Sequence, residues 1–147
     1  MFTHILVATD GTELSQNCVK KAVQFAKETA AEVTFFYAKP AAPAPYLGMG
    51  AISDTHVTEI VREHFDELAR EVLEKAAQEA RTGEIKFNCI SDVTDTPHEG
   101  IIDTAEAQGC DVIFMASHGR GSVTSFLLGS ETQKVLSHSK IPVLVYR

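Results

Sequence analysis

The sequence predicts an α/β fold in which a parallel five-stranded sheet is covered by helices on both faces. Short apolar segments alternate with longer amphipathic ones along all 147 residues. The apolar segments are continuous, as expected for parallel strands that are buried on both faces. A hydrophobic content of 44% can fill one core, so we expect residues 1–147 to form a single domain.

The predicted strands and helices follow from the spacing of apolar residues. The apolar runs that indicate strands cover 4–8, 32–38, 84–90, 111–116 and 141–146. Apolar residues at three- and four-residue intervals indicate helices over 12–29, 55–81 and 129–138. A shorter helix begins at Thr96-Pro97, with proline at the favoured first position, and Gly109 caps it. The Pro-rich residues 40–50 form an irregular connection and not a domain boundary.

The order of the strands decides where such a fold binds a ligand. We expect the Rossmann-like order 3-2-1-4-5, numbered along the chain, so that the first and fourth strands are neighbours. Ligands of open α/β sheets bind beyond the carboxyl ends of the strands, where the strand order reverses. Asp10, which follows the first strand, then meets the 116–130 segment, which follows the fourth, in one crevice.

Charge and hydropathy exclude several classes of protein. The net charge is −7, whereas proteins that bind nucleic-acid backbones or anionic membranes need a positive surface. No apolar run approaches the roughly 20 residues of a membrane span, and the first residues lack a charged-then-apolar signal pattern. We therefore expect a soluble cytoplasmic protein. Its ligand can still be a small anion, because backbone dipoles act locally.

The spacing of the cysteines and of most histidines indicates neither a metal site nor a catalytic site. Cys18, Cys89 and Cys110 are isolated and have apolar neighbours, so we expect reduced thiols in the core of a cytosolic protein. No metal-ligand spacing joins the histidines at positions 4, 56, 64, 98 and 138. We expect these five in solvated or capping positions.

A glycine-containing loop follows the fourth strand. Nine residues separate Gly119 from Gly129, and Gly129-Ser130 opens the next helix. Backbone N–H groups of such a loop, and of the helix start beyond it, surround phosphate oxygens in many proteins. Glycine suits this position because a Cβ would hold the phosphate away from the backbone. The alternative is an ordinary surface turn between a strand and a helix.

Two common phosphate-binding motifs are absent from the sequence. The P-loop needs a lysine before a hydroxyl residue at a fixed distance from glycine, and no lysine has that spacing. The dinucleotide fingerprint needs a third glycine where Thr124 stands. That fingerprint also follows the first strand of its fold, whereas this loop follows the fourth. What remains is a Gly-x-x-Gly, nine-residue, Gly-Ser/Thr pattern, to which Gly119, Gly129 and Ser130 conform.

This pattern resembles the nucleotide motif of the universal stress protein family. The resemblance extends over the whole chain and includes Thr9-Asp10, a variable middle insert, the Ser-His-Gly-Arg loop, the Leu-Leu-Gly-Ser helix start and the closing Ile-Pro-Val-Leu-Val-Tyr strand. One position departs from the motif, because its first glycine is Ala116 here. The Cβ of Ala116 is a modest obstruction that a negative φ would make tolerable, so it weakens the expectation of nucleotide binding without refuting it.

The resemblance implies a site for ATP, with Mg²⁺ on the phosphates. Small residues at the ends of the first two strands would lie against adenine and ribose, and the 118–120 and 130–132 amides would face the phosphates. Asp10 would contact ribose or Mg²⁺, or else would only stabilise the turn before the first helix. The implied binding residues are Ala8, Thr9, Asp10, Ala38, Met115, Ala116, His118, Gly119, Arg120, Gly129, Ser130, Glu131 and Thr132.

The resemblance also implies partners. In the family the last strand, Val143–Tyr146 here, pairs antiparallel with its copy, which predicts a symmetric homodimer, with a tetramer as a higher assembly. The alternative is an edge shielded by the Pro-rich residues 40–50. The implied function is that of an ATP-binding regulatory protein, a nucleotide-dependent switch acting on a partner such as a transporter.

Other functions are weighed against this one. Slow ATP hydrolysis or self-phosphorylation would need a general base beside the terminal phosphate, and no candidate is evident, so we expect no catalytic residue. An interaction module that binds no nucleotide would explain Ala116 as decay of the motif. A serine hydrolase built from Ser117, His118 and Asp10 is disfavoured, because adjacent residues point to opposite sides and no Gly-x-Ser-x-Gly surrounds Ser117.

Overall fold

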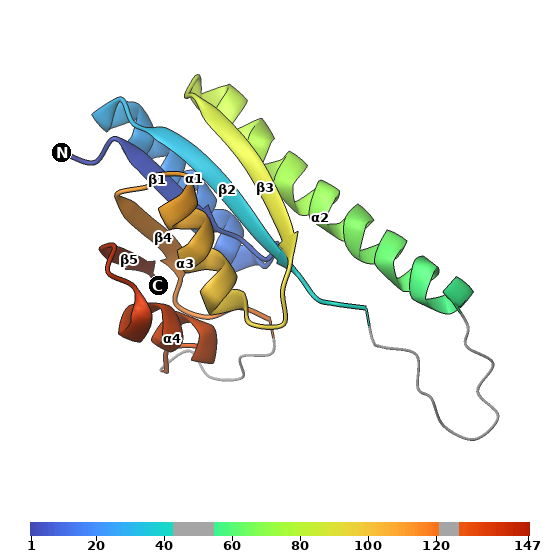
Figure 1. Cartoon of the computed structure of the whole chain (residues 1–147). Coiled ribbons are helices and arrows are strands. Elements are labelled where there is room, and N and C mark those ends of the chain that lie inside the picture. The colour runs from blue at the N-terminus through green and yellow to red at the C-terminus, as the bar shows by residue number, and fades with distance from the viewer. Residues whose placement is uncertain (43–54, 121–126) are drawn as a thin grey trace.

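An open sheet of five parallel strands forms the centre of the molecule (Figure 1). The computed structural model describes residues 1–42, 55–120 and 127–147. The strand order is β3-β2-β1-β4-β5, which confirms the predicted α/β fold and its topology. The strands are β1 (His4–Ala8), β2 (Glu32–Lys39), β3 (Phe87–Val93), β4 (Val112–Ala116) and β5 (Val143–Tyr146).

Helices cover both faces of this sheet. They are α1 (Glu13–Thr29), α2 (Thr55–Gly83), α3 (Pro97–Ala107) and α4 (Ser130–His138). Val7 and Phe35 share a core with α1 and α2, whereas Leu6 and Phe36 share a second core with α3 and α4. Neighbouring strand residues thus point to opposite cores, and the strands read as continuous apolar runs. Within the described residues, no helix combines the length and the apolar character that a membrane span requires.

The third strand differs from its prediction. It covers Phe87–Val93 instead of 84–90, because the chain turns at Glu84, whose φ is +58°. The strand lies at the edge of the sheet, and its residues are exposed or half-buried. Its pairing with β2 continues through Ser91 and Asp92. An edge strand pairs through its backbone without needing an apolar run, which is why apolar patterning misplaced it.

The other boundaries follow the predictions closely. The last strand begins at Val143 instead of 141, because Ser139 Oγ accepts from the Ile141 amide (3.0 Å) and donates to the Ile141 carbonyl (2.8 Å), which holds a turn. Thr12 caps α1 through its side chain, and Pro97 begins α3 as predicted. Gly109, with φ +68°, follows the end of α3 in a conformation that favours glycine.

Two of the three cysteines lie in the core, and the third does not. Cys18 and Cys110 are buried, but Cys89 is exposed on β3, so the expectation of a core thiol is wrong for Cys89. Burial raises the pKa of Cys18 to about 12. Burial likewise raises the pKa of Cys110 to about 11. Both buried thiols therefore stay protonated and unreactive at neutral pH.

A chain of polar side chains crosses the α3 side of the sheet. His4 Nε2 lies 2.8 Å from Oγ1 of Thr34, a fully buried residue. Thr34 Oγ1 donates to Asn88 Oδ1 (2.5 Å), and Asn88 Nδ2 donates to Gln108 Oε1 (3.3 Å). His4 is therefore a bonded, half-buried residue, and the expectation of a solvated or capping position is wrong for it.

Candidate functional site

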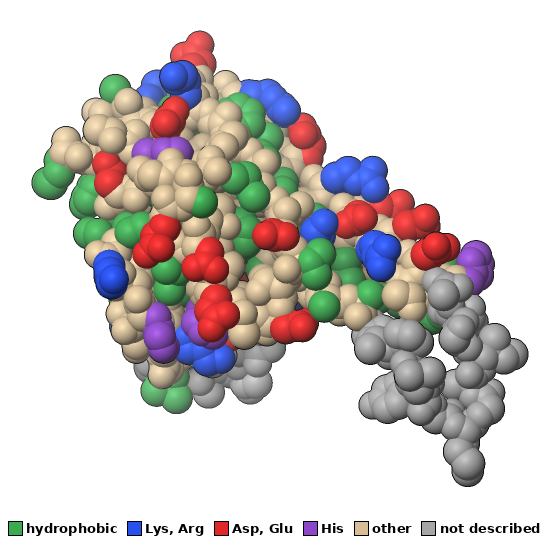
Figure 2. All heavy atoms as spheres, viewed as in Figure 1, with side chains coloured by type: hydrophobic (Ala, Val, Ile, Leu, Met, Phe, Trp, Pro, Cys, Tyr) green, Lys and Arg blue, Asp and Glu red, His purple; other side chains and the backbone are tan. Residues whose placement is uncertain are grey.

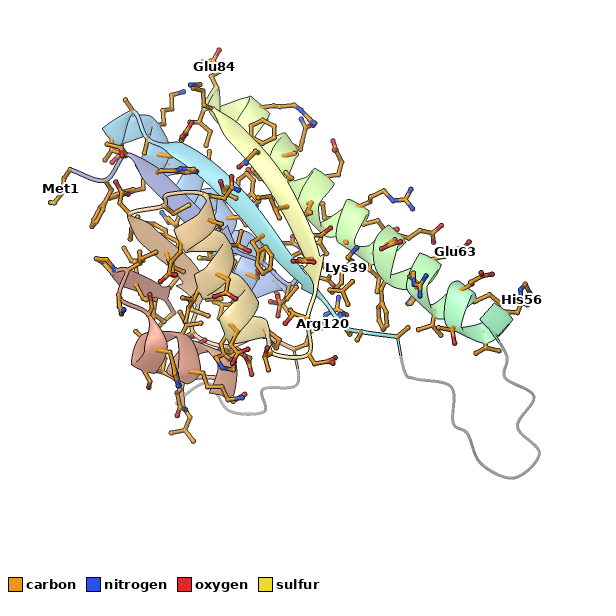
Figure 3. All side chains as sticks on the ribbon, in the orientation of Figure 1. Met1, Lys39, His56, Glu63, Glu84 and Arg120 are labelled. Carbon is orange, nitrogen blue, oxygen red and sulfur yellow. The ribbon has the colours of Figure 1, made fainter. Side chains whose placement is uncertain are left out.

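A cavity of about 480 Å³ opens at the carboxyl ends of β1, β2 and β4. Every residue that the sequence named as a candidate for binding lines it, namely Ala8, Thr9, Asp10, Ala38, Met115, Ala116, His118, Gly119, Arg120, Gly129, Ser130, Glu131 and Thr132. Figure 3 shows Arg120 at the same end of the sheet as Lys39, the last residue of β2. Residues 121–126 of the loop and 43–50 of the Pro-rich connection lie outside the described residues.

Asp10 joins the end of β1 to the turn after β4. Its Oδ1 accepts from the backbone N–H (3.0 Å) and the hydroxyl (2.7 Å) of Thr12, at the start of α1. Its Oδ2 accepts from the Arg120 amide at 3.0 Å. The carboxylate therefore stabilises the turn into α1, the structural role that the sequence left open, and also binds the turn after β4. The Arg120 amide, expected to face phosphate, donates here to Asp10.

Buried hydroxyls fix the turn that presents Asp10. Thr9 Oγ1 lies 2.7 Å from Ser15 Oγ, which accepts from the Asp10 amide at 3.1 Å. The Thr9 amide donates to the Phe36 carbonyl at 3.0 Å, extending the β1–β2 ladder by one residue. Thr9 and Ser15 are both buried, so the position of Asp10 is set by satisfied internal hydrogen bonds.

Gly119 and Gly129 lie where neighbouring atoms leave no room, or little room, for a side chain. A Cβ added to Gly119 would collide with the Asp10 carboxylate. A Cβ on Gly129 would lie 3.1 Å from the Cα of His118, a tight approach to backbone. Both are motif glycines of the predicted loop, and their absent side chains let the turn after β4 pack against Asp10 on one side and the start of α4 on the other.

The start of α4 faces the same cavity. The Gly129 amide donates to the Ser117 carbonyl (2.7 Å), and Thr132 Oγ1 donates to the Ala116 carbonyl (3.0 Å), so this helix end is tied to the end of β4. Gly129 is the N-cap and provides no capping side chain. The first turn of α4 therefore presents backbone N–H groups and the positive end of the helix dipole to the cavity.

Ala116 occupies the position of the missing motif glycine. Among the described non-glycine residues, positive φ values occur at Ala30 and Glu84, so Ala116 has the negative φ of an ordinary strand residue. Its backbone has no need of glycine, and although the residue lines the cavity, its side chain packs in the core shared with α1 and α2.

The Glu131 side chain links α4 to α3. Its Oε2 accepts from the backbone N–H of His98 (2.8 Å) and lies 3.0 Å from His98 Nδ1. Its Oε1 accepts from Lys134 Nζ at 3.0 Å. Although partial burial acts to raise it, these hydrogen bonds hold the pKa of Glu131 below its usual value. Glu131 thus caps the first turn of α3 from the neighbouring helix, a role that the sequence did not suggest.

Ser117 and His118 lie closer than expected. Ser117 Oγ is 3.1 Å from His118 Nδ1, so the sequence argument that these adjacent side chains point apart is wrong. The bond forms because Ser117 lies just beyond β4, where strand alternation has ended. Among the described residues no hydrogen bond joins His118 to Asp10, whose oxygens are bound by Thr12 and Arg120. A Ser–His–Asp triad is therefore not assembled in this part of the chain.

The sequence is similar to known proteins over its whole length. The sequence model of the universal stress protein family matches residues 1–147. The chain belongs to this family. It is 32% identical to universal stress protein YxiE of Bacillus subtilis, with 100% of both chains covered. It is 31% identical to universal stress protein MJ0577 of Methanocaldococcus jannaschii, covering 100% of this chain and 96% of that one.

Solved structures show the same fold. The structure of MJ0577 superimposes with a TM-score of 0.84 at 29% identity, covering 99% of this chain and 96% of that one. A universal stress protein solved in complex with cAMP has a TM-score of 0.73 at 19% identity, over 99% and 97% of the two chains. The Archaeoglobus fulgidus protein in complex with dAMP has a TM-score of 0.70 at 17% identity, over 100% and 98%.

Part of the cavity wall is formed by residues that the family motif did not indicate. The additional lining residues are Ser15, Phe36, Tyr37, Pro97, Ile101, Leu127 and Leu128. They include residues near the carboxyl end of β2 and on the first turns of α1 and α3. The predicted topology carried a signal for them, because side chains around the carboxyl ends of neighbouring strands share one crevice. The sequence did not tell which of them would turn inward.

Proposed function

We propose that this universal stress protein is an ATP-binding regulatory protein that acts as a nucleotide-dependent switch. The observation that carries the proposal is the single cavity in which the end of β1, the turn after β4 and the start of α4 meet. Its volume of about 480 Å³ falls in the range of small-molecule sites. Two structural neighbours were solved with adenine nucleotides, cAMP and dAMP, which supports a ligand of this class.

The two ends of the cavity suit different parts of ATP. Phe36, Ala38, Ile101 and Met115 form an apolar wall that suits the adenine ring. The turn at 118–120 and the start of α4 offer backbone N–H groups to the phosphates. The Arg120 amide would exchange its bond to Asp10 for one to phosphate, so nucleotide binding would reorganise this turn.

The donor set fits Mg²⁺ bound together with phosphates. Asp10 and Ser130 bring one carboxylate and one hydroxyl to the phosphate end of the cavity. Mg²⁺ commonly takes one or two carboxylates, with phosphate and water oxygens completing its shell. Asp10 would hold the ion through an oxygen that now accepts from Thr12 or Arg120, and the ion would neutralise phosphate charge. The site therefore needs no further protein ligand for this purpose.

Reorganisation of the 118–120 turn is the step that makes a switch. A partner protein, a transporter being one class, would recognise the surface around this turn in one nucleotide state, in a cytoplasmic setting. We propose that the chain acts as a homodimer through β5, with a tetramer as a higher assembly. The outer edge of β5 is the open edge of the described sheet, and Leu144 on it is exposed.

Calorimetric titration of the full chain with ATP, with and without Mg²⁺, tests the proposal. Ala38→Leu fills the apolar wall and is expected to weaken ATP binding about ten-fold or more while leaving pyrophosphate binding unchanged. Val93→Leu, at the exposed end of β3, is the matched control and should bind as the wild type does. ATP binding that is unaffected by Ala38→Leu would contradict the assignment of this cavity.

A further inference from the structure

Two histidines far apart in the sequence meet on the outer side of α3 and α4. The ring centroids of His98, in the first turn of α3, and His138, in the last turn of α4, are 5.7 Å apart with an interplanar angle of 49°. Figure 2 shows histidine side chains beside acidic and basic ones over this part of the surface. Forty positions separate the two residues, so no sequence spacing could have indicated the pair.

Each ring is anchored through the same nitrogen. His138 Nδ1 lies 2.8 Å from the Lys134 carbonyl, which can only accept, so Nδ1 carries the proton. His98 Nδ1 lies 3.0 Å from the Glu131 carboxylate and donates to it for the same reason. In the neutral ring this leaves a lone pair on Nε2 of both residues. Imidazoles that bind metals are held in this way, by donation of the other ring N–H to a carboxylate or carbonyl.

The two rings are neighbours, and in each the Nδ1 bond leaves the edge that carries Nε2 without a bond among those described. Glu131, Lys134 and His138 follow one face of α4, two turns long. The Nδ1 side of His98 faces Glu131 at the first of these turns, and the His98 ring lies beside that of His138 at the last. Two imidazoles sharing a tetrahedral Zn²⁺ through bonds of ~2.0–2.1 Å have ring centroids about 5–6 Å apart. The observed separation lies within that range.

We infer that His98 and His138 form a binding site for a divalent transition-metal ion, Zn²⁺ or a chemically similar ion, that bridges α3 and α4. The described residues contain no group of three His, Cys, Asp or Glu side chains arranged to hold a metal, so water completes the coordination shell. The Lys134 ammonium is paired with Glu131, which offsets its charge near the ion. His138 is exposed and gives access from solvent, whereas the His98 side chain is 12% exposed.

The site is separate from the nucleotide cavity but adjoins its rim. Pro97 and Glu131, the chain neighbour and the hydrogen-bond partner of His98, both line the cavity. A metal bridge would hold the start of α3 against the end of α4 in their present arrangement. The inference does not depend on the proposed function, because it concerns residues that do not line the cavity.

Zn²⁺ titration of the full, tag-free chain by calorimetry tests the inference. We expect one Zn²⁺ per chain, with at least ten-fold weaker binding in His98→Asn and in His138→Asn. Asparagine keeps an N–H donor near the position of Nδ1, so the bonds to Glu131 and to the Lys134 carbonyl are retained while the Nε2 ligand is lost. His64→Asn, at an exposed position on α2, is the matched control and should bind as tightly as the wild type.

A second readout is taken first on the wild-type chain, by NMR. Zn²⁺ should move the ring-nitrogen NMR signals of two of the six histidines, and mutation should assign these to His98 and His138. Zn²⁺ should also raise the melting temperature of the wild type and of His64→Asn but not of the two ligand variants. Absence of Zn²⁺ binding, or equal binding by wild type and both ligand variants, would overturn the inference.

Discussion

Gly119 is the residue at which the motif and the geometry coincide most closely. It has no room for a Cβ because the Asp10 carboxylate lies against it, and that carboxylate accepts from the amide of the next residue, Arg120. The Asp10 carboxylate thus explains why this motif position is a glycine. The contact joins two segments more than a hundred residues apart, and it forms only because β1 and β4 are adjacent in the sheet.

Gly119→Ala should displace Asp10 and the turn that it binds. We expect ATP affinity to fall about ten-fold or more, which corresponds to roughly 1.4 kcal/mol. Gly109→Ala is the matched control. The φ of Gly109, +68°, disfavours alanine by ~1 kcal/mol, but an added Cβ would meet no neighbouring atom there. That control should lower the melting temperature without changing ATP affinity. Equal ATP affinity in Gly119→Ala and wild type would show that Asp10 does not shape the site.

The polar chain around Thr34 gives a second prediction for a single residue. Thr34→Val keeps the shape but removes the fully buried hydroxyl shared by half-buried His4 and exposed Asn88, so stability should fall by about 1 kcal/mol. Urea denaturation measures the difference. Thr82→Val, at the exposed end of α2, should cost much less. A loss no larger than that of Thr82→Val would mean that water replaces the missing hydroxyl.

Sequence patterns could predict the glycine turn but not this polar chain. Gly119 and Gly129 stand at a recognisable spacing, and the strand order then places them beside Asp10. His4, Thr34 and Asn88 come from three strands, and their contact depends on register. Thr34 sits inside an apolar run, where a hydroxyl is uninformative until its partners are known. Contacts that depend on a few ångströms between distant segments, such as His98 with His138, escape prediction for the same reason.

Among the elements, β1 and β4 are joined at their amino ends by Asp111. Its carboxylate accepts from the Thr3 amide (2.8 Å), the Thr3 hydroxyl (2.9 Å) and the His4 amide (3.2 Å). Partial burial acts to raise the pKa of Asp111, but these bonds together hold it below the usual value of 3.8.

Central strands were predictable because burial on both faces leaves a continuous apolar run. The edge strand β3, half-buried and exposed, was displaced in the prediction because it lacks one.

Asp111→Asn tests this junction through its pH dependence. A carboxyl group whose pKa is lowered by folding stabilises the protein above its unfolded pKa, and that contribution is lost as pH falls through the folded pKa. Asp111→Asn should therefore be less stable than wild type at pH 7, by about 1 kcal/mol, and the difference should shrink below about pH 4. Urea denaturation across this pH range measures it. A difference that stays constant with pH would rule out the carboxylate charge as its source.

At the scale of the whole molecule, the open edge of β5 decides how copies assemble. The amide of Ile113 donates to the Pro142 carbonyl and that of Ser117 to the Tyr146 carbonyl. Even-numbered residues of β5 therefore bond to β4, and the N–H groups of Val143 and Val145 face the open edge. Antiparallel pairing of two such edges across a two-fold axis would use these groups.

Val145→Pro should abolish dimerisation without breaking the β4–β5 ladder. It removes an N–H that faces the open edge, and proline is tolerated in an edge strand. We expect sedimentation to show a dimer for the wild type and a monomer for the variant. Leu144→Val, which leaves all backbone donors in place, is the control and should remain dimeric. A dimeric Val145→Pro protein would mean that the copies associate elsewhere.

The central claim, that the cavity binds ATP, is tested most directly by analysing what the protein carries. Freshly purified full-length protein is denatured, and the released supernatant is chromatographed for adenine nucleotides and quantified against chain concentration. Our account predicts ATP at about one equivalent per chain, or, if the protein is isolated empty, a rise in melting temperature with Mg-ATP. An empty protein with no thermal response to Mg-ATP would contradict it and favour a module that binds no nucleotide.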